Sequence, residues 1–233
     1  MNAQASSRRA NAGPRRGSQA IERRGGGRGT ARAAAPRGRA AGGRGETPKA
    51  RGERTRRRVA DALVSLLEEG DPSPTAKTVA ARAAVSVRLV FHHFEDMESL
   101  YRAVLSLQAS QYWDTVRSVP ADRPVEDRID QTVQQRAKLF DAVGAVRRAG
   151  VTLASRQPDI AAQIAESDAQ LRSWLEETFA PELRSAGRER RELLFALDTA
   201  ASWEAWDRMR RTEHLSAAAS RRVMARTIRS LLA

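Results

Sequence analysis

The stretch of residues 75–100 constrains the fold of this chain more than any other feature. Thr75 can cap a short helix, residues 83–85 form a tight turn, and Ser86 can cap a second short helix. Phe94 and the two acidic residues after it end the second helix before a third helix begins. Two short helices at this spacing predict a helix-turn-helix, in which the second helix is shaped to lie in a DNA major groove.

Apolar spacing divides the two short helices into inner and outer faces. Val79, Ala80 and Ala83 form the inner face of the first helix, and Val90 and Phe94 face inward at i, i+4 in the second. This spacing leaves an outer face for a partner, made of Val87, Arg88, Phe91 and His92.

Residues 54–69 precede this motif and predict an amphipathic helix that Gly70 ends. Its apolar positions recur at i, i+4, i+7 and i+8, at Val59, Leu63, Leu66 and Leu67. Four arginines crowd the predicted first turn, Arg54, Arg56, Arg57 and Arg58. Cations at that end oppose the helix dipole, and a nearby phosphate would offset the cost. We therefore favour contact with the DNA backbone over a merely solvated face.

The formal charge is concentrated at the N-terminus. Residues 1–52 carry a net charge of +11, because twelve arginines and one lysine face only Glu22 and Glu46. The same segment has almost no large apolar side chain and eleven of the fifteen glycines, so we expect it to be disordered. A cationic tail attracts polyanions by counterion release. Nucleic acid is the favoured partner, an anionic membrane is the alternative, and the segment is either a DNA-binding arm or a dispensable extension.

Several classes of function lack support in the sequence. The chain has no cysteine, which excludes disulfides and thiolate zinc sites. Adjacent side chains on a helix, such as His92 and His93, point about 100° apart, and only His214 remains, so we expect no metal site. No catalytic motif or cofactor-binding loop is present, so we expect neither an enzyme nor a bound cofactor. No apolar run approaches the roughly 20 residues of a membrane span, and we expect a cytoplasmic protein.

The helix-turn-helix stretch resembles the DNA-binding domain of the TetR family of transcriptional regulators. The resemblance covers about residues 55–104 and lies in a set of scaffold positions: Thr75, Val79, Ala80, Ala83, Val85, Ser86, Phe91, His93, Phe94, Glu98 and Leu100. It implies a sequence-specific DNA-binding transcriptional regulator, a repressor that a small molecule releases from double-stranded DNA. The alternative is a ligand-independent or architectural DNA-binding protein that relies on the basic arm.

Five positions depart from the family pattern. Ala84 replaces the usual turn glycine, Phe91 replaces a tyrosine, and Met97 replaces a lysine. Leu89 replaces a small polar residue, whereas Arg88 adds a charge where a small residue is common. We therefore predict that the motif makes weaker contacts with DNA phosphates and has an unusual base preference.

The outer face suggests how bases would be read. Arg88 is the best candidate to contact guanine, and Val87 and Leu89 could touch thymine methyl groups. His92 could contact a base edge, whereas His93 is expected to pack locally. The full predicted DNA-binding set is Arg54, Arg56, Arg57, Arg58, Thr75, Lys77, Ser86, Val87, Arg88, Leu89, Phe91, His92, His93 and Met97.

The remainder of the chain predicts helices only, about nine in all with the first domain. Apolar spacing and prolines place C-terminal helices at about residues 98–119, 125–140, 143–151, 158–179, 188–211 and 216–232. We expect an all-α protein with a tail at 1–52, a helix-turn-helix domain at 53–101 and a helical regulatory and dimerisation domain at 102–233.

The resemblance also implies roles for the C-terminal helices. It implies a pocket for an unknown small-molecule effector, for which we expect Trp113, Phe140 and Trp174, although ordinary core packing explains each aromatic residue. Arg147, Arg148, Arg156 and Gln134 could meet a ligand or form a solvated face. It further implies a homodimer through the last two long helices, with Leu197, Ala201, Trp203, Val223, Ile228 and Leu231 at the interface. A two-fold dimer implies a palindromic operator.

Overall fold

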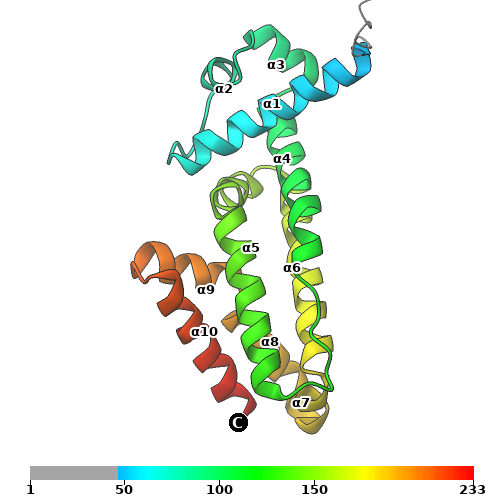
Figure 1. Ribbon diagram of the computed structural model, residues 1–233, viewed down its shortest axis with the longest axis vertical. Helices are drawn as coiled ribbons and strands as arrows, with labels where there is room; N and C mark the ends of the chain where they lie inside the picture. The colour runs from blue at the N-terminus through cyan, green and yellow to red at the C-terminus, as the bar shows by residue number, and fades with distance from the viewer. Residues whose placement is uncertain (1–46) are drawn as a thin grey trace, which may run out of the picture. The chain divides into compact units, whose positions relative to one another are not determined.

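The computed structural model describes residues 47–233, and these contain helices and no β-strand (Figure 1). The predicted all-α fold class is confirmed for this part of the chain. The predicted disordered arm lies, up to residue 46, outside the described residues. None of the helices described is long and apolar enough to cross a membrane.

Helix α1 (Pro48–Glu68) begins earlier than the predicted start at Arg54. The Thr47 side chain caps it by accepting a hydrogen bond from the Ala50 N–H at 3.3 Å, and Pro48 occupies the first helical turn, where its missing N–H costs nothing. The arginines from Arg54 onward therefore lie beyond the first turn. The dipole effect fades within one turn, so the predicted electrostatic conflict at these arginines is wrong.

Helices α2 (Ala76–Arg82), α3 (Val87–His93) and α4 (Met97–Tyr112) complete the N-terminal domain. They pack on α1 around a core that includes Leu63, Val79, Val90, Phe94 and Leu100, all at most 3% exposed. The same core takes in side chains of the next two helices, so the N-terminal domain is packed on the body. Helix α4 crosses the predicted boundary at residues 101 and 102 without a break and ends in a 3-10 turn (Trp113–Thr115).

Helix α5 (Val125–Ala154) runs through the body between α6 (Pro158–Thr178) and α10 (Ala217–Leu232) (Figure 1). The sequence predicts two helices here, at about residues 125–140 and 143–151, and that prediction is wrong. A Cβ atom added at Gly150 would lie 3.4 Å from Leu105 and Ile164 side chains, so the glycine permits close packing of α4 and α6 on α5. Burial of these faces stabilises the helix more than the glycines weaken it.

The segment predicted as one helix at 188–211 is divided. Helix α8 (Arg190–Ala200) ends, the Ser202 side chain caps α9 (Trp203–Asp207) by accepting from the Ala205 N–H at 3.1 Å, and a π-helical turn (Arg208–Thr212) follows. Ahead of them lie α7 (Ala180–Ser185) and a 3-10 turn (Gly187–Glu189). The predicted start of the last helix is confirmed, since Ser216 caps α10. These helices enclose a second core with Phe140, Leu197 and Trp206.

Candidate nucleic-acid interface and ligand cavity

Two hydroxyl side chains shape the helix-turn-helix. The Thr75 side chain accepts a hydrogen bond from the Thr78 N–H at 3.2 Å. The Thr78 side chain in turn accepts one from the Thr75 N–H at 2.9 Å, and the two bonds form a capping box on α2. Ser86 caps α3 by accepting from the Leu89 N–H at 3.2 Å. Both predicted DNA-contact residues are exposed, but each already has a structural role in starting its helix.

The turn between the two helices contains a strained residue. Ala84 has φ of 50°, in the left-handed region that glycine adopts without a steric penalty. The Val85 N–H donates to the Ala80 carbonyl at 3.0 Å across this turn. The motif therefore keeps its geometry although alanine replaces the glycine, and the cost is local strain.

The outer face of α3 is exposed as predicted. Val87 and Phe91 are 38% and 45% exposed, and Arg88 and His92 are also exposed, whereas Val90 is buried. Two other predicted DNA contacts are less exposed. Leu89 is half-buried, and Met97 is half-buried and packs on the N-terminal core. Four side chains of one short helix are thus left free for a partner.

Arg56 connects α1 to the end of α3. Its guanidinium lies 4.8 Å from the centre of the Phe94 ring and donates to the His93 carbonyl oxygen at 3.4 Å. A cation at a helix C-terminus interacts favourably with the helix dipole, so Arg56 positions α3 on α1. Arg57 is exposed and 3.7 Å from Asp61, while Arg54 and Arg58 are exposed.

The adjacent histidines pack on each other. The His92 and His93 rings lie 5.3 Å apart with an angle of 74° between their planes. Burial, followed by the charges of His92 and Arg56, lowers the pKa of His93, so the neutral ring is favoured. Among residues 47–233, no group of three or more His, Cys, Asp or Glu side chains could hold a metal ion.

An ion pair connects α2 to the end of α1. The sequence pattern does not reveal it. Arg82 at the end of α2 donates to both carboxylate oxygens of Glu69, at 2.5 and 2.6 Å. The hydrogen bond from Arg82 lowers the pKa of Glu69. Both side chains are exposed, so the pair orients α2 on α1 more than it stabilises the fold.

A small cavity lies in the body, between α4, α5 and α6. Its volume is about 70 Å³, well below the ~300–1,000 Å³ of ordinary ligand pockets. Trp113 and Phe140 line it, as predicted, together with Gln108, Arg147 and Trp203. The other lining residues are Leu105, Ala109, Leu139, Val143, Gln163, Ile164, Ser167 and Leu171.

Trp174 does not line this cavity, so the predicted trio needs correction. Its ring packs edge-on against Trp113, with centroids 5.3 Å apart and an angle of 88° between the planes. Trp174 also lines a separate space of about 10 Å³, together with Arg136, which donates to the Leu171 carbonyl oxygen. Burial lowers the pKa of Arg136 to about 10.

Three side chains at the cavity carry buried polar atoms without a hydrogen-bond partner in the protein: Gln108 Oε1, Arg147 Nε and Trp203 Nε1. Each residue is at most 8% exposed. A buried polar atom left unpaired costs about 1–3 kcal/mol. Of the three, only Arg147 was named as a possible ligand contact. Gln108 and Trp203 were missed, because the three residues lie on three different helices and no spacing in the sequence connects them.

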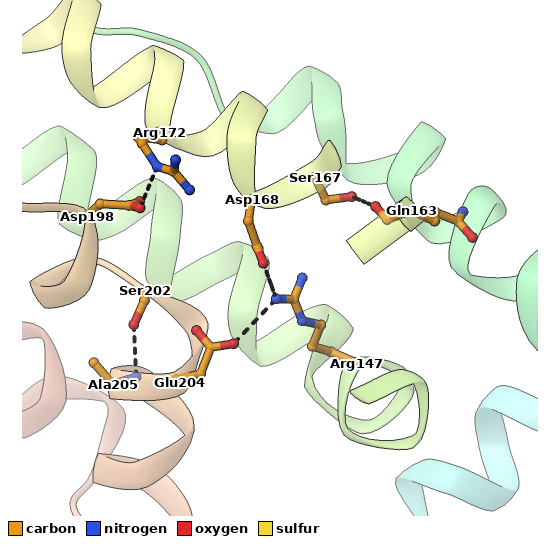
Figure 2. Close-up of polar contacts among 9 residues, drawn as sticks. All are labelled: Arg147, Gln163, Ser167, Asp168, Arg172, Asp198, Ser202, Glu204 and Ala205. Atoms are coloured by element: carbon orange, nitrogen blue, oxygen red, sulfur yellow. Dashed lines mark hydrogen bonds and ion pairs between the residues drawn. The ribbon is translucent and has the colours of Figure 1, made fainter. Parts of the chain in front are cut away.

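The charge of Arg147 is balanced by two carboxylates (Figure 2). Its Nη2 donates to both oxygens of Asp168 at 2.8 Å and lies 3.4 Å from a Glu204 oxygen. Arg147 thus joins α5 to α6 and α9. Nearby, Arg172 pairs with Asp198 at 2.7 Å. The solvated-face interpretation of Arg147 is therefore wrong, since its side chain is only 9% exposed.

Most of the predicted dimer residues lie inside the protomer. Leu197, Ala201, Trp203 and Ile228 are at most 8% exposed and belong to the second core. They cannot meet a partner without opening that core, so this part of the prediction is corrected. Val223 is 44% exposed and Leu231 is half-buried. Phe195 on α8, which the prediction omitted, is also 44% exposed.

Comparison with solved structures identifies the architecture. A regulator of Rhodococcus sp. assigned to the TetR family is 13% identical, with a TM-score of 0.61 over 77% of this chain and 100% of the other. The chain has the TetR fold. A transcriptional regulator of Rhodococcus sp. Rha1 is 18% identical, with a TM-score of 0.61 over 76% of this chain and 95% of the other. A TetR-family protein of Mesorhizobium loti is 19% identical, with a TM-score of 0.52 over 80% and 98%.

In TetR-fold terms, α1–α3 form the helix-turn-helix domain, and α4 leads into the helical body. No protein-family profile and no curated protein sequence matches the chain. Structural similarity at low sequence identity therefore assigns this fold.

Proposed function

We propose that this protein is a DNA-binding transcriptional regulator of the TetR family. The observation that carries the proposal is the exposed outer face of α3 on a complete helix-turn-helix. Val90 and Phe94 hold the inner face of α3 on the core, so the helix can enter a groove as a rigid unit. The likeness of the whole fold to solved regulators supports the same function.

Arg88 is the proposed base-reading residue. It is exposed on the first turn of α3, where recognition helices contact base edges. A bidentate contact from arginine to guanine contributes about 1–3 kcal/mol of discrimination. Val87 beside it offers an apolar surface to a thymine methyl group, and Lys77, Arg57 and Arg58 are exposed cations for phosphates.

The protein acts as a homodimer in this proposal. Phe195 on α8 and Val223 on α10 are large apolar side chains exposed on two helices that pack on each other. Arg172 and Arg191 flank the Phe195 ring, with guanidinium carbons 5.4 and 5.8 Å from its centre. A two-fold pairing of these faces presents two copies of α3 to half-sites about one DNA turn apart, which predicts a palindromic operator.

A small molecule in the cavity is the proposed effector, and its binding releases the repressor from DNA. The cavity borders α4, the helix that joins the reading domain to the body. Two contacts hold α4 to α6, Arg102 with Asp159 and Gln163 with Ser106, each at 2.8 Å. A ligand between these helices changes the equilibrium only through different affinities for the DNA-bound and released arrangements.

Selection of bound sequences from a random DNA library tests the proposal. We expect a palindromic consensus, and we expect Arg88→Ala to lose the preference at one position in each half-site. Arg184→Ala is the matched control, because Arg184 is an exposed arginine on α7 of the body. No consensus, or an identical one for Arg88→Ala, contradicts the assignment.

A second function has its own support. The +11 charge of residues 1–52 favours an architectural DNA-binding protein in which the arm supplies the affinity. Removal of residues 1–46 distinguishes the two, and it spares the Thr47 cap of α1. If selective binding survives and only the salt dependence falls, α3 is the reader. If all binding to DNA disappears, the arm supplies the affinity. Either function places the protein in the cytoplasm with its DNA.

A further inference from the structure

The unpaired polar atoms of the body are concentrated at one cavity. Within residues 47–233, four buried side-chain atoms have no hydrogen-bond partner in the protein, and Gln108, Arg147 and Trp203 supply three of them. All three residues line the same cavity, and all three are more than nine-tenths buried. Buried polar groups in folded proteins are almost always paired. This clustering indicates a built site for an occupant with matching groups.

An occupant that reaches the three atoms must match their hydrogen-bonding groups. Gln108 Oε1 accepts a hydrogen bond, whereas Arg147 Nε–H and Trp203 Nε1–H donate. The occupant must therefore offer one donor and an acceptor for up to two donors. A carboxamide has both, since its carbonyl oxygen carries two lone pairs and its nitrogen carries N–H groups. Leu139, Phe140 and the other apolar lining residues suit a hydrocarbon body.

The charges around the cavity exclude a strongly anionic occupant. Asp168 and Glu204 already oppose the single positive charge of Arg147, and Asp198 opposes that of Arg172 (Figure 2). Arg136 lines the separate space that Trp174 also lines, and it does not line this cavity. A carboxylate would add an unmatched negative charge in a poorly hydrated site. An uncharged molecule leaves the existing ion pairs intact.

The volume limits the size of the occupant. About 70 Å³ is roughly half of the ~150 Å³ of a cavity that holds benzene. Leu105, Ala109 and Ile164 on the α4 and α6 side are only half-buried, whereas Gln108, Arg147 and Trp203 are buried. We therefore expect the polar group of a small molecule to lie beside the buried residues and its apolar part beside the half-buried ones.

We propose that the cavity binds a small, uncharged molecule that carries an adjacent hydrogen-bond acceptor and donor on a short apolar body, as a primary carboxamide does. The proposal deepens the effector site of the proposed function and rests on it. Gln108 receives the donor of the ligand, and Trp203 and Arg147 share its acceptor.

Titration of the full chain, without DNA, tests the proposal by nuclear magnetic resonance of the indole N–H groups. Three probes of similar shape are used: isobutyramide, isobutyrate and 2,3-dimethylbutane. Trp203→Phe identifies the Trp203 signal. The Trp206 signal is the internal control, because its Nε1 already donates to Asp141 at 2.9 Å.

We expect isobutyramide to shift the Trp203 signal saturably while the Trp206 signal stays in place. Its dissociation constant should be roughly fivefold or more below those of the other probes, the value of one net hydrogen bond. Gln108→Leu should remove this preference without weakening the binding of 2,3-dimethylbutane.

Three results overturn the proposal. Tighter binding of isobutyrate contradicts the uncharged class, and equal binding of 2,3-dimethylbutane contradicts the role of the polar atoms. No movement of the Trp203 signal with any probe means that ordered water alone pairs these atoms. Selection of DNA sequences with the same sample is independent of all three results, so failure of the ligand proposal and failure of the DNA-binding function remain distinguishable.

Discussion

At the scale of single residues, the strained turn of the helix-turn-helix leads to a stability prediction. Ala84→Gly removes a left-handed alanine, which costs roughly 1–2 kcal/mol, and adds glycine entropy worth roughly 0.5–1 kcal/mol. We expect the free energy of unfolding to rise by roughly 0.5–1 kcal/mol, measured by urea denaturation. Ala81→Gly in the helical part of α2 is the control and should lower it by about 1 kcal/mol. Equal effects of the two changes would contradict the strain.

The unpaired amide in the cavity leads to a second prediction at this scale. Gln108→Leu removes a buried oxygen that has no partner in the protein and keeps an apolar side chain of similar size. We expect an increase in unfolding free energy of about 1 kcal/mol without ligand. Gln163→Leu is the matched control, since Gln163 donates to Ser106 at 2.8 Å and its loss should lower stability or leave it unchanged. A loss of stability in Gln108→Leu equal to that of the control would show that Gln108 is already paired.

At the scale of helices, an ion pair links α5 to α7. Arg128 donates to both oxygens of Glu182 at 2.8 and 2.6 Å, and these bonds hold the pKa of Glu182 below its ordinary value. A carboxyl whose pKa is lowered on folding stabilises the fold above its unfolded pKa of 4.5, and the stability is lost as the pH falls through the folded value.

Glu182→Gln should therefore reduce the unfolding free energy by about 2 kcal/mol at pH 7 and flatten its fall below pH ~4.5. Thermal unfolding at several pH values measures both effects. Glu126→Gln is the control, because Glu126 pairs with Arg229 at 2.6 Å on an exposed surface, where solvent screens the charges. Equal acid sensitivity of wild type and Glu182→Gln would refute the assigned role of the pair.

The start of α4 carries a prediction about DNA affinity. Met97 occupies the first position of α4 and packs on the N-terminal core. In Met97→Lys the aliphatic stem can keep this packing while the ammonium group reaches solvent or phosphate. We expect tighter binding to all DNA sequences alike, with a salt slope steeper by about one. Unchanged affinity in a gel-shift titration would show that α4 does not approach the backbone.

At the scale of the whole molecule, the proposed homodimer leads to a prediction. Phe195→Glu and Val223→Glu each place a charge on the proposed interface, and we expect either change to produce monomers in sedimentation analysis. Val151→Glu is the matched control, because Val151 is 43% exposed on α5, outside α8 and α10. Dimers in all three variants would place the interface elsewhere.

The helix-turn-helix domain was largely predictable from the sequence. The caps at Thr75 and Ser86 and the inward pair Val90 and Phe94 depend on residues three or four positions apart. Such local hydrogen bonds and helical spacing can be predicted from short stretches of sequence. The start of α1 was missed only because Thr47 and Pro48 follow a segment rich in arginine and glycine.

The sequence by itself determined a helical protein with an exposed α3 on a helix-turn-helix. Only the tertiary structure decided which apolar faces of the body are interior. Helical spacing identifies an apolar face, but it does not show whether the same protomer or a partner covers that face. Leu197 and Ile228 thus fill the protomer's own core, while Phe195 and Val223 stay outside. The meeting of Gln108, Arg147 and Trp203 at one cavity likewise depends on the packing of separate helices, which no local pattern contains.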